Sequence, residues 1–207
     1  VDCDGTYIIP GLVDVHTHGR SGYDFNTADE QGVRRMREEY AKIGTTTIMA
    51  TLASATMESF EESIAAINKN RTAEKGCANI AGIHLEGRYL NPKKRGAHAE
   101  NLLAPLDADE AGALIKKMMP LPVHVSAALE EDGAEFFVKT LVGMGATVAL
   151  AHSDATYDEA MKAVEWGATA FTHTFNAMRA MHHREPGPMV ASMLSDGAFT
   201  EIICDGL

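Results

Sequence analysis

Cysteine is scarce in this 207-residue sequence, which carries only Cys3, Cys77 and Cys204, widely spaced and without a CxxC pair. An odd, scattered set argues against a disulfide framework and is typical of a protein kept in a reducing compartment. No apolar run approaches the ~20 residues that a membrane-spanning helix requires, and no signal peptide opens the chain. The sequence therefore predicts a cytoplasmic protein.

Basic charge is also in short supply, with 18 Lys and Arg residues against 29 Asp and Glu and a net charge of -11. That excess of negative charge repels nucleic acid and anionic lipid as general partners, so a phosphorylated small molecule would need a local basic pocket. No GxGxxG follows the first expected strand, and neither a P-loop nor a GxSxG motif occurs. These absences argue against a dinucleotide-binding fold, a P-loop nucleotide site and a serine nucleophile.

Apolar and amphipathic segments alternate along the chain, which is 45% apolar and 23% charged, as in a soluble domain with a sizeable core. Helices are expected at 28–42, 56–69, 108–118, 132–144 and 157–166. Short runs rich in Thr, Val and Ile predict strands at 12–16, 44–50, 80–85, 121–126, 146–151, 168–172 and 199–204. Seven buried strands that alternate with helices predict a parallel α/β fold.

Polar residues mark where some of these helices begin. Two capping boxes, Thr27 to Glu30 and Thr156 to Glu159, open the first and the last of them. Asp107 opens the helix at 108–118 in a looser version of the same pattern. These signals fix the expected helix starts.

Metal-type side chains follow four of the apolar runs: His16 and His18 after IIPGLVDV, Glu86 after IAGIHL, His152 after ATVALA and His173 after ATAFT. In a doubly wound sheet the ligands meet at one switch-point crevice, so few strand ends contribute. A (β/α)8 barrel gathers residues from many strand ends onto one face, which favours a TIM-type barrel here. A closed barrel needs eight strands and the sequence shows seven, so we expect an incomplete barrel of about seven βα units.

The chemistry of these residues points to a metal when they are taken together. His16 and His18 lie two residues apart, so their imidazoles point to the same side of an extended segment, although a lone HxH is more often two polar residues in a turn. Glu86 follows a buried strand, where a carboxylate is costly unless it is paired or bound to metal; alone it could be a solvated loop acid. His152 and His173 could each be core residues, but with Glu86 they form the set of many hydrolytic zinc sites.

Other polar residues share the face on which the expected ligands lie. His84 is on the same side of its strand as Glu86, and is either a further ligand or a residue that hydrogen-bonds to the ligands. Two basic loops, 92–98 (PKKRGAH) and 182–187 (HHREPG), follow strands toward this face. In an acidic protein they indicate a phosphate or carboxylate on the substrate, with Arg184 the better candidate and the lysines more typical of solvated charge.

Five segments then match a known family in order: IIPGLVDVHTHG, HLEGRYLNPKKRGAHAE, AHSDAT, FTHTFNAMRAMHHREPG and ICDGL. They resemble the N-acetylglucosamine-6-phosphate deacetylases of the amidohydrolase superfamily over nearly all 207 residues. The HLEG…GAH and HxFNAM…HHREPG segments are specific to this family, far more than a bare HxH. The resemblance implies a metal-dependent TIM-type barrel that hydrolyses the acetamide of N-acetylglucosamine 6-phosphate to glucosamine 6-phosphate and acetate.

The resemblance also implies the ligands of the metal. Glu86, His152 and His173 match the family's main metal ligands. His16 and His18 match the superfamily's HxH, which some members use for a second metal and others have lost. We therefore expect one or two divalent ions, Zn²⁺ in the first place and Fe²⁺ as the alternative.

Substrate and partner contacts come from the same resemblance. In the family the phosphate-binding arginine belongs to the neighbouring subunit, which implies a homodimer. The catalytic Asp, the general base, is expected beyond Leu207, so the chain as it stands is expected to be inactive. Residues 1–10 would be a lead-in or a remnant of the family's small β-domain, and 11–207 the barrel without its C-terminal end. The residues that match substrate-binding positions are Ala97, His98, Asn176, Ala177, Arg184, Asp205, Gly206 and Leu207.

One departure from the family lies close to the chemistry. Arg88 stands where the family usually has Pro after HLEG, and we expect that it could disturb the turn that aims Glu86. Two alternatives stay open at this point. One is another amidohydrolase, either dihydroorotase-like or a deacetylase for a different amino sugar, and the other is a non-catalytic, amidohydrolase-like binding protein.

Overall fold

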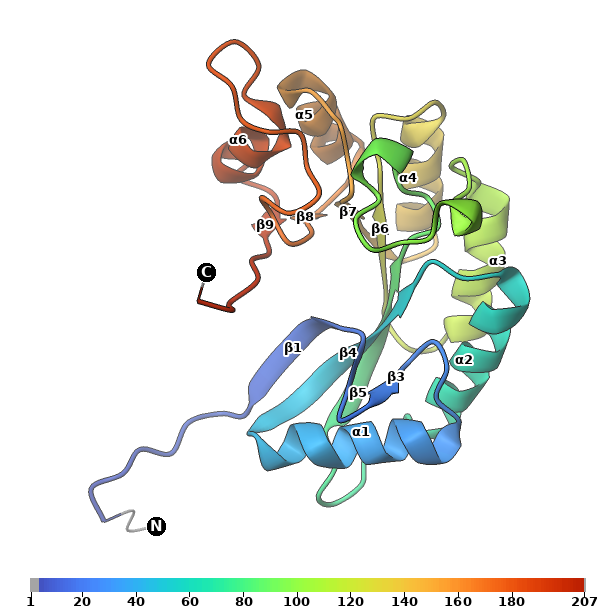
Figure 1. The fold of residues 1–207 in the computed structure, drawn as a ribbon, viewed down its shortest axis with the longest axis vertical. Coiled ribbons are helices and arrows are strands. Elements are labelled where there is room, and N and C mark those ends of the chain that lie inside the picture. Colours follow the sequence, from blue (N-terminus) through green and yellow to red (C-terminus); the bar gives the residue numbers. More distant parts are fainter. Residues whose placement is uncertain (1–3, 207) are drawn as a thin grey trace.

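Seven parallel strands form one curled sheet in the computed structural model, which describes residues 4–206. Their order in the sheet follows the sequence, so neighbours along the chain are neighbours in space. β1 and β9 are the two edges and do not pair with each other, so the sheet is a TIM-type barrel left open on one side (Figure 1). All seven predicted strands are confirmed: β1 (Leu12–Thr17), β4 (Thr45–Ala53), β5 (Asn79–Glu86), β6 (Val123–Ala127), β7 (Thr147–Leu150), β8 (Ala170–Phe171) and β9 (Phe199–Thr200).

The α-helices cover the outer face of this sheet (Figure 1). The five predicted helices are confirmed as α1 (Glu30–Lys42), α2 (Met57–Lys69), α3 (Ala108–Met118), α4 (Ala134–Gly143) and α5 (Tyr157–Trp166). The sequence did not predict α6 (Gly187–Leu194), because Gly187 and Pro188 are typical of a loop, although proline fits the first turn of a helix. The short elements β2 (Gly19–Arg20), β3 (Tyr23–Asp24), η1 (Pro92–Lys94) and η2 (Glu100–Leu102) were not predicted either.

The helix starts follow the capping signals with one exception. The capping box of Thr156 and Glu159 is present at α5. At α1 the N-cap is Asp29, whose Oδ1 accepts from the Gly32 main-chain N–H at 2.8 Å. The box predicted from Thr27 is therefore wrong, since the helix begins later and the short Asp side chain caps as well as Thr would.

The two faces of the sheet differ because side chains alternate along each strand. In β5, Ile83 and Leu85 pack in the apolar core with the helices, whereas His84 and Glu86 face the concave interior. Each large apolar side chain buried in that core stabilises the fold by roughly 1.5–3 kcal/mol. The core thereby fixes the strand ends from which the interior polar residues project. Its largest members include Phe25, Met36, Ile48, Leu52, Phe60, Ile67, Leu114, Phe137 and Leu141.

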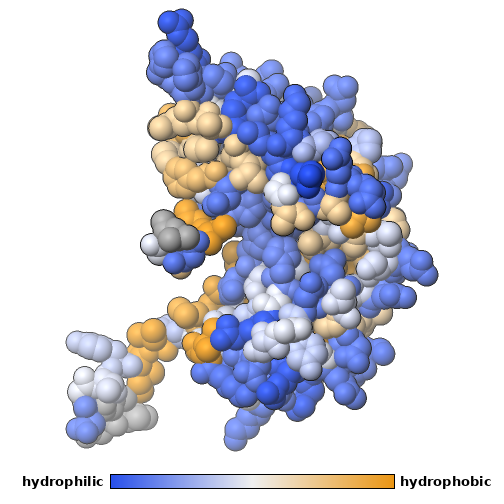
Figure 2. All heavy atoms as spheres, in the orientation of Figure 1, coloured by the Kyte–Doolittle hydropathy of each residue, from blue (hydrophilic) through white to orange (hydrophobic). Residues whose placement is uncertain are grey.

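Apolar side chains stay exposed at both edges of the sheet. Leu12 and Val13 of β1 and Phe199 of β9 are exposed. Figure 2 shows apolar atoms gathered on the side of the molecule where the N-terminal segment and the C-terminal tail lie. Exposed apolar side chains therefore line the open side of the barrel.

The segment before β1 is exposed along residues 4–10, which form a turn and extended chain. Val1–Cys3 lie outside the described residues, so the assignment of residues 1–10 to a small β-domain stays a prediction, as does the boundary at residue 11. Within residues 4–206, no helix is both long enough and apolar enough to cross a membrane.

Candidate metal centre

The side chains predicted to bind metal converge on one carboxylate. Glu86, the last residue of β5, is 2% exposed. Its Oε1 lies 3.2 Å from His152 Nε2 and 3.0 Å from His173 Nε2. Its Oε2 lies 3.2 Å from His16 Nε2 and 2.8 Å from His18 Nε2. The structure therefore brings together all five predicted ligands, from the ends of four strands.

These contacts divide the centre into two sets of three ligands that share Glu86. The inner triad is Glu86, His152 and His173, and the outer triad is His16, His18 and Glu86. Within each triad the ligand atoms lie within 4.8 Å of one another. A carboxylate with one oxygen in each set can bridge two cations, and imidazole with carboxylate suits zinc and similar divalent metals.

The proton on His152 shows why a cation fits the inner triad. His152 Nδ1 lies 2.8 Å from the Lys94 main-chain oxygen, which can only accept a hydrogen bond. Nδ1 therefore carries the proton, and in the neutral ring Nε2 turns a lone pair toward Glu86 Oε1. Two acceptors that face each other at 3.2 Å need a positive charge between them, supplied by a further proton or by a metal.

The charge of Glu86 is set by the same neighbours. Burial alone would raise its pKa, but the hydrogen bonds of His152, His16, His173 and His18 outweigh burial and hold the pKa well below its usual range. For His173, burial lowers the pKa, and the hydrogen bond and charge of Glu86 outweigh that effect and raise it. Glu86 is thus ionised, and its negative charge favours a cation among these imidazoles, either a proton or a divalent metal.

The backbone around the centre is held in conformations that side chains rarely adopt. His152 and His173 have φ angles of 46° and 33°, in the left-handed region. Such strain persists only where the surrounding structure imposes it, and it clusters at functional sites. Gly87, directly after Glu86, has a φ of 102°, and a Cβ there would lie 2.2 Å from Ser54 Oγ. Only glycine therefore fits the turn that follows the shared carboxylate.

His98, predicted to bind substrate, lies at the edge of the outer triad. Its Nδ1 accepts from the Ser54 main-chain N–H at 3.3 Å and lies 2.9 Å from Ser54 Oγ. Burial lowers its pKa to about 4, so the ring is neutral at pH 7 and its proton is on Nε2. That N–H lies 3.7 Å from Glu86 Oε2, so His98 presents a donor to the space beside the centre.

The sequence profile of the amidohydrolase family matches residues 7–199. The chain belongs to the amidohydrolase family. Proteins of this family depend on metal, and the five converging ligands match that chemistry.

Curated relatives that match this chain share one name. The N-acetylglucosamine-6-phosphate deacetylase of Vibrio furnissii is 33% identical over 199 residues, which cover 96% of this chain and 50% of that protein. The protein of that name from Homo sapiens is 35% identical over 200 residues, covering 94% of this chain and 48% of its own length. The chain spans about half the length of the curated relatives it matches.

A solved structure extends the likeness to three dimensions. A mutant N-acetyl-D-glucosamine-6-phosphate deacetylase from Mycobacterium smegmatis, in complex with N-acetyl-D-glucosamine-6-phosphate, matches with a TM-score of 0.89 at 36% identity. The match covers 96% of this chain and 51% of that one. The incomplete barrel is thus similar in fold to about half of a solved deacetylase chain.

The remaining predicted substrate residues lie on loops and in the C-terminal tail. Asn176 and Ala177 form the turn after His173, where Asn176 N donates to His173 O at 2.9 Å and Ala177 O accepts from Ser153 N at 3.1 Å. Ala97 is exposed beside His98. Arg184 is exposed in the loop before α6, and its Nε lies 3.2 Å from His183 Nε2. Asp205 and Gly206 lie in the exposed tail after β9, and Leu207 lies outside the described residues.

The departure at Arg88 leaves the shared carboxylate in place. Arg88 Nε lies 3.1 Å from Glu110 Oε1 on α3, and its main-chain oxygen accepts from Ala104 N at 2.8 Å. Glu86 keeps its contacts to all four imidazoles. The guanidinium is therefore directed to a helix carboxylate and does not compete for Glu86.

Several residues that shape the centre escaped prediction. Ser54, which fixes the tautomer of His98, lies 44 positions away in the sequence. The Lys94 carbonyl, which fixes His152, lies 58 positions away. A serine hydroxyl and a main-chain oxygen have no signature in a sequence, so only the folded contacts reveal them.

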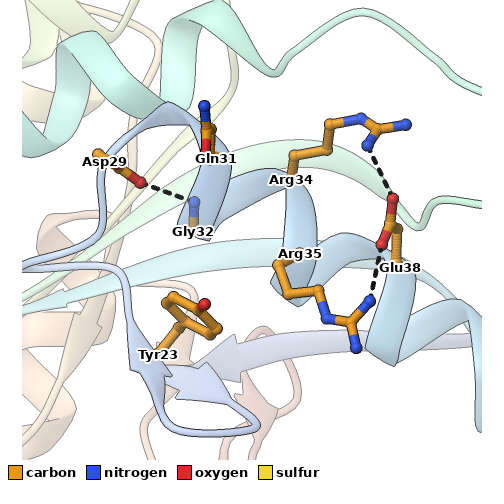
Figure 3. Close-up of a pocket in the computed structure, with 7 residues that line it drawn as sticks. All are labelled: Tyr23, Asp29, Gln31, Gly32, Arg34, Arg35 and Glu38. Atoms are coloured by element: carbon orange, nitrogen blue, oxygen red, sulfur yellow. Dashed lines mark hydrogen bonds and ion pairs between the residues drawn. The ribbon is translucent and has the colours of Figure 1, made fainter.

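The groove in Figure 3 lies on the outer surface of α1, away from the centre. Its guanidinium groups are already paired, with Arg34 Nη1 2.9 Å and Arg35 Nη1 3.3 Å from the Glu38 carboxylate. It shares no residue with either triad, and no function follows from it. Its lining residues are Tyr23, Asp29, Gln31, Gly32, Arg34, Arg35 and Glu38.

Proposed function

We propose that this protein hydrolyses the acetamide of N-acetylglucosamine 6-phosphate, giving glucosamine 6-phosphate and acetate. Support comes from membership in the amidohydrolase family and from relatives with the name N-acetylglucosamine-6-phosphate deacetylase. The likeness to a deacetylase structure that holds N-acetyl-D-glucosamine-6-phosphate supports the choice of substrate.

The observation that carries the proposal is the Glu86 carboxylate between two pairs of imidazoles. The inner triad would hold one divalent cation and the outer triad a second, and we propose zinc because imidazole with carboxylate is its usual hydrolytic ligand set. Bound there, zinc supplies a water with a pKa of about 7 and polarises the acetyl carbonyl.

Protein groups beside the ligands would bind and orient the sugar phosphate. His98 offers its Nε2 proton to the substrate, because Ser54 already occupies Nδ1. Ala97, Asn176 and Ala177 lie on loops next to ligand residues, where they would contact the sugar. Asp205, Gly206 and Leu207 keep their proposed place in the substrate site through the family resemblance alone.

Arg184 is proposed to bind the phosphate of a substrate held by a neighbouring subunit. Its guanidinium is exposed in a loop before α6, so it is free to reach beyond its own chain. A bidentate arginine suits a phosphate group. This role requires a homodimer, and we propose one in the cytoplasm, consistent with the free thiols of Cys77 and Cys204.

Acetate release from N-acetylglucosamine 6-phosphate tests the proposal. The natural full-length protein, loaded with zinc, should release acetate from this substrate and much less from unphosphorylated N-acetylglucosamine. A Glu86→Ala variant is the matched control. Turnover no greater than that of the control would refute the proposed function.

A further inference from the structure

A chain of hydrogen bonds crosses the barrel interior beneath the two triads. Thr17 N donates to Thr51 Oγ1 at 2.9 Å, and Thr51 Oγ1 lies 3.4 Å from His84 Nδ1. His84 Nε2 lies 2.7 Å from Ser126 Oγ. Ser126 Oγ in turn lies 2.7 Å from Thr172 Oγ1. The chain therefore joins β1, β4, β5, β6 and the residue that follows β8.

One consistent set of donors and acceptors satisfies these bonds. Thr17 contributes a main-chain N–H, so Thr51 Oγ1 accepts it and its own hydroxyl is free to donate to His84 Nδ1. In that arrangement His84 Nε2 carries the ring proton and donates to Ser126 Oγ, and the Ser126 hydroxyl donates to Thr172 Oγ1. One neutral tautomer of His84 satisfies every link.

The chain begins and ends beside the metal ligands. Thr17 lies between His16 and His18, and Thr172 directly precedes His173. At its centre, the His84 ring packs edge-on against the ligand His16, with ring centroids 4.6 Å apart. No link of the chain uses a ligand nitrogen or a Glu86 oxygen, so it leaves the ligand atoms open.

Burial makes the chain hard to replace. Thr51, His84, Ser126 and Thr172 are all 0% exposed, so water does not compete for their polar atoms. Leaving a buried hydroxyl without its hydrogen-bond partner costs free energy. These bonds therefore stabilise the strand register that keeps the partners together. At the β1 end, Tyr40 of α1 also stabilises the position of Thr17, because its hydroxyl contacts Thr17 Oγ1 and donates to Gly19 O at 2.8 Å.

We propose that Thr51, His84, Ser126 and Thr172 form a positioning relay that holds the outer and inner triads at the spacing two cations require. The relay rests on the metal centre of the proposed function and contributes no ligand of its own. Thr51 serves the outer triad through Thr17, and Thr172 serves the inner triad through His173. Ser126 joins the two ends, so its loss should affect both.

Titration of the metal-free protein with Co²⁺, followed by visible absorption and calorimetry, tests the relay. Ser126→Ala should weaken Co²⁺ binding about 10- to 100-fold at both triads, the usual effect of groups that orient metal ligands. The isosteric Thr51→Val should weaken mainly the outer triad, and Thr172→Val mainly the inner one. If Ser126→Ala does not fold, Thr51→Val and Thr172→Val still test the relay.

The matched control is Ser63→Ala, which removes another buried serine hydroxyl, that of Ser63 on α2, bonded to the Asn26 and Ser59 main-chain oxygens. It should lower the thermal midpoint as Ser126→Ala does and leave Co²⁺ affinity unchanged. Equal Co²⁺ affinity and spectra in the relay variants and the unmodified protein would overturn the relay, as would equal weakening by Ser63→Ala.

The outcomes also separate the relay from the proposed function. If the unmodified protein binds no Co²⁺, both the relay and the metal centre are overturned. If Co²⁺ binding responds to the relay variants but the full-length protein releases no acetate, the proposed function alone is overturned.

Discussion

The inner and outer triads share one carboxylate but differ in how their histidines are held. His152 and His173 follow β7 and β8, which have a strand on each side, and their side chains are 6% and 11% exposed. His16 and His18 belong to the end of β1, an edge strand with a single neighbour, and their side chains are 18% and 43% exposed. The histidines of the inner triad are therefore buried and follow strands paired on both sides, whereas those of the outer triad are more open to solvent.

This difference in burial predicts that the two metal sites sharing Glu86 differ in affinity. Electrostatic attraction is stronger where water is excluded, and ligands that are already held lose less freedom on binding. We therefore expect the inner triad to bind its cation more tightly and to fill first. The outer triad, open to solvent, would exchange its cation more readily.

The largest effect is expected from removal of the shared charge. Glu86→Gln keeps the side-chain volume but removes the anion from both triads, so zinc affinity should fall by more than about 100-fold at both, beyond the loss seen when groups outside the ligand set are removed. Elemental analysis after dialysis against limiting zinc measures the change. Glu110→Gln, at the carboxylate that pairs with Arg88, is the control and should keep its zinc. Full zinc content in Glu86→Gln would contradict the shared carboxylate.

The next effect separates the two triads. His152→Ala should lower the affinity of the tighter zinc site about 100-fold, whereas His16→Ala should leave that site within about 10-fold of the unmodified value. Calorimetric titration of the metal-free variants resolves the two steps. If His16→Ala removed the tighter site and His152→Ala spared it, the ranking of the triads would be reversed.

The dependence of zinc binding on pH tests the charge state of the inner triad. The effect of Glu86 outweighs burial and raises the pKa of His173 above 6.5. As the pH falls through that raised pKa, a proton occupies the ring nitrogen through which His173 would bind a cation. Inner-triad affinity should then fall about tenfold per pH unit. The same proton stabilises the metal-free fold below pH 6.5, and this contribution is lost as the pH rises through the raised pKa. Zinc affinity that stays constant from pH 8 to pH 5 would argue against this proton.

The smallest effect is expected at Arg88. Its ion pair with Glu110 is partly exposed, so Arg88→Met should lower the free energy of unfolding by less than about 1 kcal/mol. Zinc affinity should not change, because the guanidinium does not touch Glu86. A loss of zinc in this variant would show that Arg88 positions the carboxylate after all.

The sequence best predicted the features that depend on the alternation of side chains along a strand and on where each strand ends. Alternation along β5 placed His84 and Glu86 on one face, and the strand ends located His16, His152 and His173. Hydroxyl groups such as Ser126 were not foreseen, because serine is common in every environment and its partners lie on other strands. The unequal burial of the triads also escaped prediction, since it depends on which strand forms the edge of the sheet. The helix α6 was missed because glycine and proline at its start resemble a loop.

The most direct test of the shared carboxylate is anomalous diffraction at the zinc absorption edge from crystals of the protein. Two peaks should flank Glu86, one among Oε1, His152 and His173 and one among Oε2, His16 and His18, with the inner peak stronger at limiting zinc. Peaks remote from Glu86, or a single peak at saturating zinc, would contradict a centre in which one carboxylate serves two cations.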